Sequence, residues 1–145
     1  MLEVKNLSYQ YPKSKEDSLQ DLSLSFESGK LNILLGKNGS GKSTLRKAIL
    51  GFIKPKSGEV ILDQEDLLKR SSKEKAKRIG YLPQDIPSSS LSVYDTLLLG
   101  RLPYQSIGVK KTDNEIVYSV AEKLNLVPFL LKRNDEISLG ERQIV

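Results

Sequence analysis

The stretch that decides the fold is Ile33-Leu34-Leu35-Gly36-Lys37-Asn38-Gly39-Ser40-Gly41-Lys42-Ser43-Thr44, an apolar run that ends in a glycine-rich loop. Gly36 is followed by four residues and then by Gly41-Lys42-Ser43, which is the spacing of a phosphate-binding loop. The glycines let the backbone turn tightly and bring successive N–H groups against an anion. The helix expected after the loop adds unpaired N–H donors at its N-terminus. We therefore predict a nucleotide-binding site formed by Gly36, Asn38, Gly39, Ser40, Gly41, Lys42, Ser43 and Thr44.

Two side chains of this loop carry the chemistry. Lys42 supplies a positive charge for the β- and γ-phosphates, and Ser43 supplies a hydroxyl for a phosphate-bound Mg²⁺. The alternative is a Gly/Ser-rich turn that happens to precede a helix. The order of strand, loop and helix favours the phosphate site.

Composition places the chain among ordinary soluble domains. Its 145 residues suffice for one domain with a sizeable core. No apolar run approaches the roughly 20 residues that a membrane span needs, and the N-terminus lacks a secretory layout. The absence of cysteine excludes a disulfide framework and fits a cytosolic protein.

The net charge of +5 raises the question of a nucleic-acid partner. The one basic cluster, Lys69 to Arg78, also contains Glu74 and has the pattern of a solvated helix face. We therefore expect no nucleic-acid partner. The chain contains no histidine, so the commonest general base is missing from any mechanism.

Periodicity predicts the elements. Apolar and polar residues alternate over residues 2–9 and from Leu22 to Phe26, which indicates two half-buried strands. The run 31–35 predicts a strand buried on both faces, and residues 59–62 and 79–82 predict two shorter strands. The helix after the loop places four apolar residues at helical spacing: Leu45, Ala48, Ile49 and Phe52.

Capping boxes, in which Ser or Thr is followed three residues later by an acid, predict four helix starts. They are Ser71 with Glu74, Ser92 with Asp95, Thr112 with Glu115, and Ser138 with Glu141. The third helix carries an apolar stripe that we interpret as core packing, formed by Ile116, Val117, Val120, Ala121 and Leu124.

Three motifs together resemble one family. Residues 38–45, Asn-Gly-Ser-Gly-Lys-Ser-Thr-Leu, look like the phosphate loop of ATP-binding cassette (ABC) transporters. Tyr81-Leu82-Pro83-Gln84 resembles the family's Q-loop, and Ile137-Ser138-Leu139-Gly140-Glu141-Arg142-Gln143 is similar to its signature motif. Each of the last two is weak alone, but their order and spacing identify the chain as a member of the family.

The resemblance implies an α/β fold: a P-loop NTPase core with N-terminal antiparallel strands and an α-helical subdomain, incomplete at the C-terminus. The core would cover residues 1–91, the helical subdomain 92–136, and the start of the signature helix 137–145. Residues 60–63, Val-Ile-Leu-Asp, have the shape of a Walker B strand but lie too early, so we expect a hairpin there.

The resemblance also implies residue roles. Tyr11 would stack on adenine, with Tyr9 as the second choice. Gln84 would coordinate Mg²⁺ together with Ser43 and orient the attacking water, which makes it the one catalytic residue predicted. Ser138 and Gly140 would contact the γ-phosphate of ATP held by a second subunit.

Partners follow from the same resemblance. They are a second ATP-binding subunit in a head-to-tail dimer and membrane permease subunits, with the protein at the inner, cytoplasmic face of the cell membrane. ATP binding and hydrolysis would drive solute transport. Residues 92–104 resemble a segment found in importers of iron–siderophore complexes, haem and cobalamin, so an iron chelate is the expected solute.

Two departures from the family pattern change the expectation. Leu139 replaces the first signature glycine, where a side chain would crowd the phosphate. The sequence stops at Val145, before the family's Walker B strand and switch histidine. We therefore expect ATP binding with negligible hydrolysis, and an uncovered apolar edge at residues 33–35. A disrupted gene, an incomplete sequence and a split subunit would each explain the truncation.

Other classes stay open: a different P-loop enzyme such as a small-molecule kinase, a non-catalytic nucleotide-binding fragment, and a basic nucleic-acid binder. A kinase would need its own acceptor site and no signature helix. A nucleic-acid binder would show a steep salt dependence that does not involve Lys42.

Overall fold

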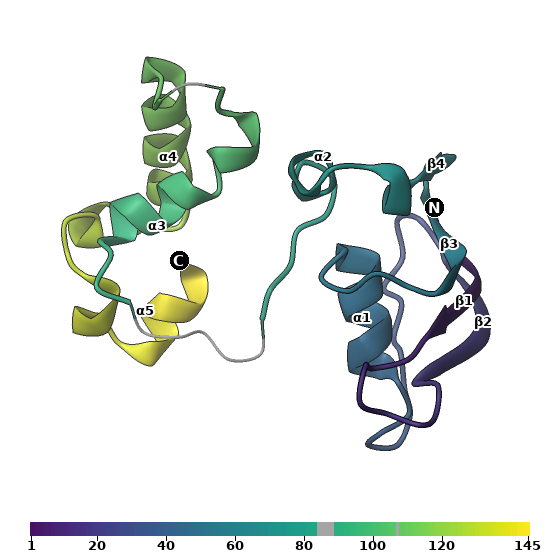
Figure 1. Cartoon of the computed structure of the whole chain (residues 1–145). Helices are drawn as coiled ribbons and strands as arrows, with labels where there is room; N and C mark the ends of the chain where they lie inside the picture. Colours follow the sequence, from purple (N-terminus) through teal and green to yellow (C-terminus); the bar gives the residue numbers. More distant parts are fainter. Residues whose placement is uncertain (84–88, 107) are drawn as a thin grey trace. The chain divides into compact units, whose positions relative to one another are not determined.

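The structure is a computed structural model that describes residues 1–83, 89–106 and 108–145. The chain forms two compact units, Met1–Gly80 and Tyr81–Val145 (Figure 1). The first combines an antiparallel sheet with helices and the second is helical, so the fold is of the mixed α/β class that the sequence predicted. The predicted subdivision at residues 91 and 136 stays a prediction.

The sheet of the first unit has four antiparallel strands in the order β2-β1-β3-β4. Their bounds are β1 Leu2–Tyr9, β2 Leu19–Phe26, β3 Ser57–Leu62 and β4 Glu65–Asp66. Val4 in the central strand β1 pairs with Leu24 on one side and Val60 on the other. The alternating pattern of the sequence therefore places apolar side chains in register across neighbouring strands.

The turn between β3 and β4 confirms the predicted hairpin. Asp63 and Gln64 adopt left-handed backbone conformations, with φ of 49° and 71°. The Asp63 carboxylate accepts a hydrogen bond of 2.7 Å from the N-terminal ammonium of Met1. This bond lowers the pKa of Asp63 below its ordinary value. Asp63 is thus a turn residue at the sheet edge.

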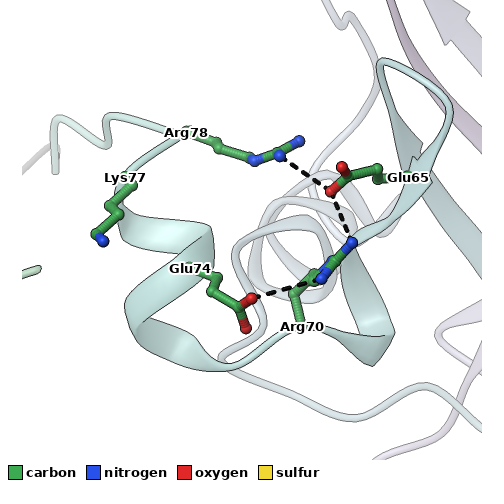
Figure 2. A pocket seen from close by; sticks show the side chains of 5 residues that line it. All are labelled: Glu65, Arg70, Glu74, Lys77 and Arg78. Atoms are coloured by element: carbon green, nitrogen blue, oxygen red, sulfur yellow. Dashed lines mark hydrogen bonds and ion pairs between the residues drawn. The ribbon is translucent and has the colours of Figure 1, made fainter.

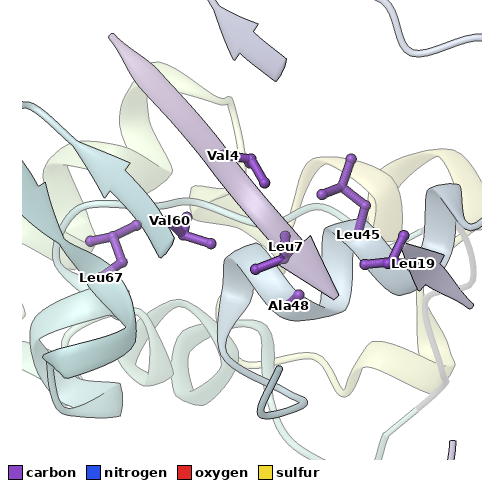
Figure 3. Close-up of a cluster of buried hydrophobic side chains, with 7 residues drawn as sticks. All are labelled: Val4, Leu7, Leu19, Leu45, Ala48, Val60 and Leu67. Atoms are coloured by element: carbon purple, nitrogen blue, oxygen red, sulfur yellow. The ribbon is translucent and has the colours of Figure 1, made fainter. Parts of the chain in front are cut away.

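Helix α1, Lys42–Leu50, packs on the sheet and completes the first core (Figure 3). Gly51 ends the helix with φ of 76°, and its N–H donates to the carbonyl of Ala48. The predicted helical position of Phe52 is wrong, since it lies beyond this cap and its side chain is exposed. The buried residues of this core are Val4, Leu7, Leu19, Leu45, Ala48, Val60 and Leu67.

The predicted strands over residues 31–35 and 79–82 are wrong. Neither segment has regular secondary structure, and Leu31 and Leu35 are 89% and 85% exposed. A strand forms only with a hydrogen-bonding neighbour. In the part of the chain that the structure describes, the sheet is complete with β1 to β4, and none of them pairs with either segment. Ile33, Leu34 and Leu35 are exposed, but they belong to an irregular segment and do not form the open strand edge that we expected.

Two short helices follow β4 in the last part of the first unit. A 3₁₀ helix, η1, covers Leu67–Lys69, and α2 covers Ser72–Ala76. The capping box of Ser71 and Glu74 is present, with the serine N–H and hydroxyl both donating to the carboxylate. This confirms the predicted helix start.

The second unit packs its helices around a separate apolar cluster. The helices are α3 Val93–Leu99, α4 Lys111–Lys123 and α5 Leu139–Ile144, with 3₁₀ helices η2 Leu102–Tyr104, η3 Val127–Phe129 and η4 Asn134–Glu136. The predicted capping of α3 by Ser92 is confirmed. The buried members of the cluster are Val93, Ala121, Leu126, Leu130 and Ile137.

Helix α4 differs from its prediction. It is capped by Asp113, whose carboxylate accepts from the backbone N–H of Lys110 at 3.1 Å, instead of by Thr112 with Glu115. Asp113 also accepts from Arg101 at 3.0 Å, and it is buried on the same face as Val117 and Ala121. The other stripe residues, Ile116, Val120 and Leu124, remain at least 36% exposed, so the stripe is only partly core.

Among the residues that the structure describes, no helix is both long and apolar enough to cross a bilayer. The longest, α4, has 13 residues. A span needs about 20.

Candidate functional site

The glycine-rich loop and the first turn of α1 form the junction that the sequence predicted. Gly39 and Gly41 have φ of 84° and 86°, a left-handed conformation that favours glycine. The N–H of Ser40 donates to the carbonyl of Lys37 at 3.2 Å, which closes a turn over residues 37–40 that contains Gly39. Residues 36–40 are exposed, and the helix begins at Lys42. The loop therefore presents its backbone to solvent at a helix N-terminus.

Lys42 lies folded back over this loop. Its ammonium donates to the carbonyl oxygens of Gly36 at 2.6 Å and Lys37 at 2.7 Å. A third, longer contact of 3.4 Å joins it to the hydroxyl of Ser40. The loop thus holds the cation by its own oxygen atoms, beside the N–H groups expected to face a phosphate.

The first turn of α1 adds donors and a hydroxyl. The N–H of Leu45 donates to the carbonyl of Gly41 at 2.8 Å, the first bond of the helical ladder. The N–H groups of the preceding residues have no intrahelical acceptor, as at any helix start. Ser43 is exposed there, whereas Thr44 is only 6% exposed. Free donors, an exposed hydroxyl and a nearby ammonium fit the phosphates and metal ion of Mg-ATP.

Tyr11 lies in the loop between β1 and β2 and reaches this helix. Its hydroxyl is 3.4 Å from the Thr44 hydroxyl. The Tyr9 ring meets the Tyr11 ring edge to face, with centroids 5.0 Å apart and planes at 86°. The structure therefore brings Tyr11, our first choice for adenine, to the turn that follows the phosphate loop. Its stacking role stays a prediction.

The signature segment begins a helix as predicted. The Ser138 hydroxyl accepts from the N–H of Glu141 at 3.2 Å, and the Glu141 carboxylate accepts from the N–H of Ser138 at 2.8 Å. Hydrogen bonds to the Glu141 carboxylate from the side chain and then the backbone N–H of Ser138 lower the pKa of Glu141 below its ordinary value. Leu139 is 66% exposed, and a Cβ placed on Gly140 would meet nothing within 4 Å. The segment belongs to the second unit, whereas the phosphate loop belongs to the first.

Gln84, the predicted catalytic and metal residue, lies outside the described residues. Within the described ranges, no group of three or more Asp, Glu, His or Cys side chains is arranged to hold a metal ion. Magnesium is commonly held by substrate phosphates and few protein ligands. Ser43 is therefore the described residue best suited to contact it.

The basic cluster lines a charged pocket of about 210 Å³ (Figure 2). The Glu65 carboxylate lies 3.1 Å from the guanidinium of Arg70 and 3.0 Å from that of Arg78. Glu74 makes a further contact of 3.5 Å with Arg70. Acidic neighbours thus offset this positive charge, and the cluster ties β4 to the segment around α2. The absence of a nucleic-acid partner stays a prediction.

Comparison with known proteins decides the family. The sequence profile described as ABC transporter matches residues 19–145. The chain belongs to the ABC transporter family. This confirms the resemblance drawn from the three motifs.

Individual relatives agree with this assignment. An uncharacterized ABC transporter ATP-binding protein of Methanocaldococcus jannaschii is 37% identical over 145 residues, which cover all of this chain and 56% of the relative. A protein of Helicobacter pylori named as an iron chelatin transport ATP-binding protein is 36% identical, over 100% of this chain and 58% of its own length.

A solved metal-chelate type ABC transporter in an inward-facing conformation is 29% identical, with a TM-score of 0.74. The match covers 99% of this chain and 52% of that chain. The predicted cassette fold is thereby confirmed. The present chain spans between half and three fifths of the length of these ABC proteins.

Sequence reasoning missed two contacts at the candidate site of this ABC chain. One is the pair of Tyr11 and Thr44, and the other is the close approach of the Ser18 carbonyl to Gly41. Both join residues far apart in the sequence. The left-handed glycine at position 41 is the one local signal that a backbone lies close by.

Proposed function

We propose that this chain is the ATP-binding part of an ABC transporter and binds Mg-ATP at the loop from Gly36 to Thr44. The observation that carries the proposal is the position of Lys42. Its ammonium lies on the glycine-rich loop at the N-terminus of α1, where a helix favours phosphate. Membership of the ABC family favours this reading over a small-molecule kinase.

Each part of the loop has a role in this proposal. The backbone N–H groups around Gly39 and Gly41 cradle the phosphates, and Lys42 neutralises their charge. Ser43 contacts the metal ion, with Gln84 as the second protein ligand and the group that orients water. Tyr11 stacks on adenine, a contact that a ring face supplies by dispersion and π interactions.

The remaining roles concern other chains. Ser138 and Gly140 at the start of α5 contact the γ-phosphate of ATP on a second subunit in a head-to-tail dimer. The helical subdomain contacts membrane permease subunits at the inner face of the cell membrane. The solute is a metal chelate, which is supported by the names of the Helicobacter pylori relative and of the solved transporter.

Calorimetric titration with Mg-ATP tests the nucleotide site. Wild-type protein is expected to bind, and Lys42→Ala is expected to weaken binding at least about tenfold, because a charged hydrogen bond to phosphate contributes about 1.5–3 kcal/mol. Lys47→Ala is the matched control, since Lys47 is an exposed lysine in the last turn of the same helix. It is expected to leave the dissociation constant unchanged.

Two results would contradict the proposal. One is the absence of binding by a folded wild-type protein, as judged by circular dichroism. The other is an equal loss of affinity in Lys42→Ala and Lys47→Ala, which would indicate a diffuse attraction to positive charge. Binding of DNA that is steeply salt-dependent and independent of Lys42 would favour the nucleic-acid alternative.

A further inference from the structure

The loop that carries Tyr11 lies directly against the phosphate loop. A Cβ placed on Gly41 would be 2.7 Å from the Ser18 carbonyl oxygen and 2.9 Å from a methyl group of Leu19. Both distances are too short for a real Cβ, so only glycine allows this approach. The backbone between β1 and β2 therefore packs on the last loop residue before α1.

Several bonds fix the shape of this loop. The N–H of Ser18 donates to the carbonyl of Tyr9 at 2.8 Å, and the N–H of Ser14 donates to that of Tyr11 at 2.9 Å. At the far end of the loop, the Asp17 carboxylate pairs with the ammonium of Lys56 at 2.8 Å. Tyr11 is thus mounted on a segment that is tied to the sheet at both ends.

The side chain of Tyr11 is held as well. Its hydroxyl contacts the hydroxyl of Thr44, and its ring meets the ring of Tyr9 at 86°. An edge-to-face contact occupies at most one face of the Tyr11 ring, which leaves a face for another aromatic group. Thr44 is buried and stands directly after Ser43, so the contact links the ring to the first turn of α1.

We propose that Thr44 is a positioning residue that holds the Tyr11 ring for the base of the nucleotide. The inference rests on the proposed function, because it assigns to Thr44 a role in binding the adenine of Mg-ATP. A ring that is already oriented loses less conformational freedom on binding, so its contribution to affinity increases. The phosphate loop and the Tyr11 ring are then both in place before the nucleotide binds. Thr44 affects the binding of adenine through its contact with Tyr11.

The test compares two ligands with four proteins. Mg-ATP and Mg-tripolyphosphate, which lacks the nucleoside, are titrated into wild type, Tyr11→Phe, Thr44→Val and the double variant. The contact between the Tyr11 and Thr44 hydroxyls is long, at 3.4 Å. Each single substitution is therefore expected to weaken the binding of Mg-ATP only about two- to fivefold. The double variant should be no weaker than either single variant, because both remove the same contact.

Tripolyphosphate separates this role from a direct phosphate contact. Tyr11→Phe should leave the affinity for tripolyphosphate unchanged. Thr44→Val should weaken the binding of tripolyphosphate less than it weakens the binding of Mg-ATP. Thr44→Ser, which keeps a hydroxyl, should restore the wild-type ratio between the affinities for Mg-ATP and Mg-tripolyphosphate. Thermal unfolding of each variant verifies that the fold is retained.

Three outcomes overturn the inference. Thr44→Val could weaken the binding of both ligands by the same factor. Alternatively, the losses of affinity in the two single variants could multiply in the double variant. Wild type could also bind tripolyphosphate as tightly as ATP, so that the base adds nothing. In each case the Lys42-dependent phosphate site survives, whereas failure of wild type to bind either ligand removes the proposed function and the inference together.

Discussion

The ammonium of Lys42 lies 2.6 Å from the carbonyl oxygen of Gly36, six residues earlier in the same loop. The cation is therefore paired with the protein's own backbone. A nucleotide must draw Lys42 from these carbonyls onto its phosphates, which exchanges neutral acceptors for charged ones. An ammonium attracts an anionic phosphate oxygen more strongly than a neutral carbonyl oxygen, so this exchange favours binding.

The close approach at Gly41 predicts an effect on stability. Gly41→Ala places a Cβ against the Ser18 carbonyl and forces alanine into a left-handed conformation, which costs about 1–3 kcal/mol. Urea unfolding measures this loss. Gly80→Ala is the control, because an added Cβ there meets nothing within 4 Å, and it should change stability by no more than about 0.5 kcal/mol. Equal effects of the two substitutions would contradict the account.

The two separate cores predict separable destabilisation. Leu7 and Leu126 are 0% and 2% exposed in different units, and replacing either by alanine should cost about 2–5 kcal/mol. Amide hydrogen exchange locates the loss. We expect Leu7→Ala to speed exchange in β1 and β3, and Leu126→Ala to speed exchange in α4. Faster exchange in both units from either variant would show that the units unfold together.

The capping box of α2 predicts a pH dependence. Hydrogen bonds from the Ser71 hydroxyl and N–H lower the pKa of Glu74 below its ordinary value. Because the folded-state pKa is lowered, the stabilisation is fully present above the ordinary pKa of glutamate and is lost as the pH falls through the lower, folded-state pKa. An NMR titration of the Glu74 carboxyl should show the lowered pKa, and Ser71→Ala should raise it. An unchanged pKa in Ser71→Ala would contradict this explanation.

The chemistry of the loop predicts binding without turnover. Residues 36–44 contain no acidic side chain, and the chain contains no histidine. Phosphoryl transfer also needs a group that orients water, and Gln84 is the sole candidate that we name for it. For these 145 residues tested by themselves, we predict phosphate release from Mg-ATP near the rate without protein. Release that is well above this rate and is abolished by Lys42→Ala would contradict the prediction.

Local signals were sufficient for part of the fold and the site. The bounds of β1, the hairpin at Asp63 and the caps at Ser71 and Ser138 depend on residues within a few positions of each other, and the sequence predicted them. The phosphate loop is likewise a local pattern. The same family motifs led to the correct cassette fold.

Contacts between distant residues account for the failures. The strand predicted at residues 31–35 needs a neighbouring strand that periodicity cannot reveal. The buried face of α4 includes Asp113, which pairs with Arg101 from outside the helix. Tyr11 and Thr44 lie 33 positions apart, and no spacing rule joins them.

The most direct test of the central claim is an amide NMR titration of the protein with Mg-ATP. The account predicts the largest shifts at residues 36–44, where the loop releases Lys42, together with a change at Tyr11. Lys42→Ala should suppress these shifts at the same ligand concentration. Shifts centred on another segment, such as α4, or shifts that persist in Lys42→Ala would contradict the assignment of this loop as the ATP site.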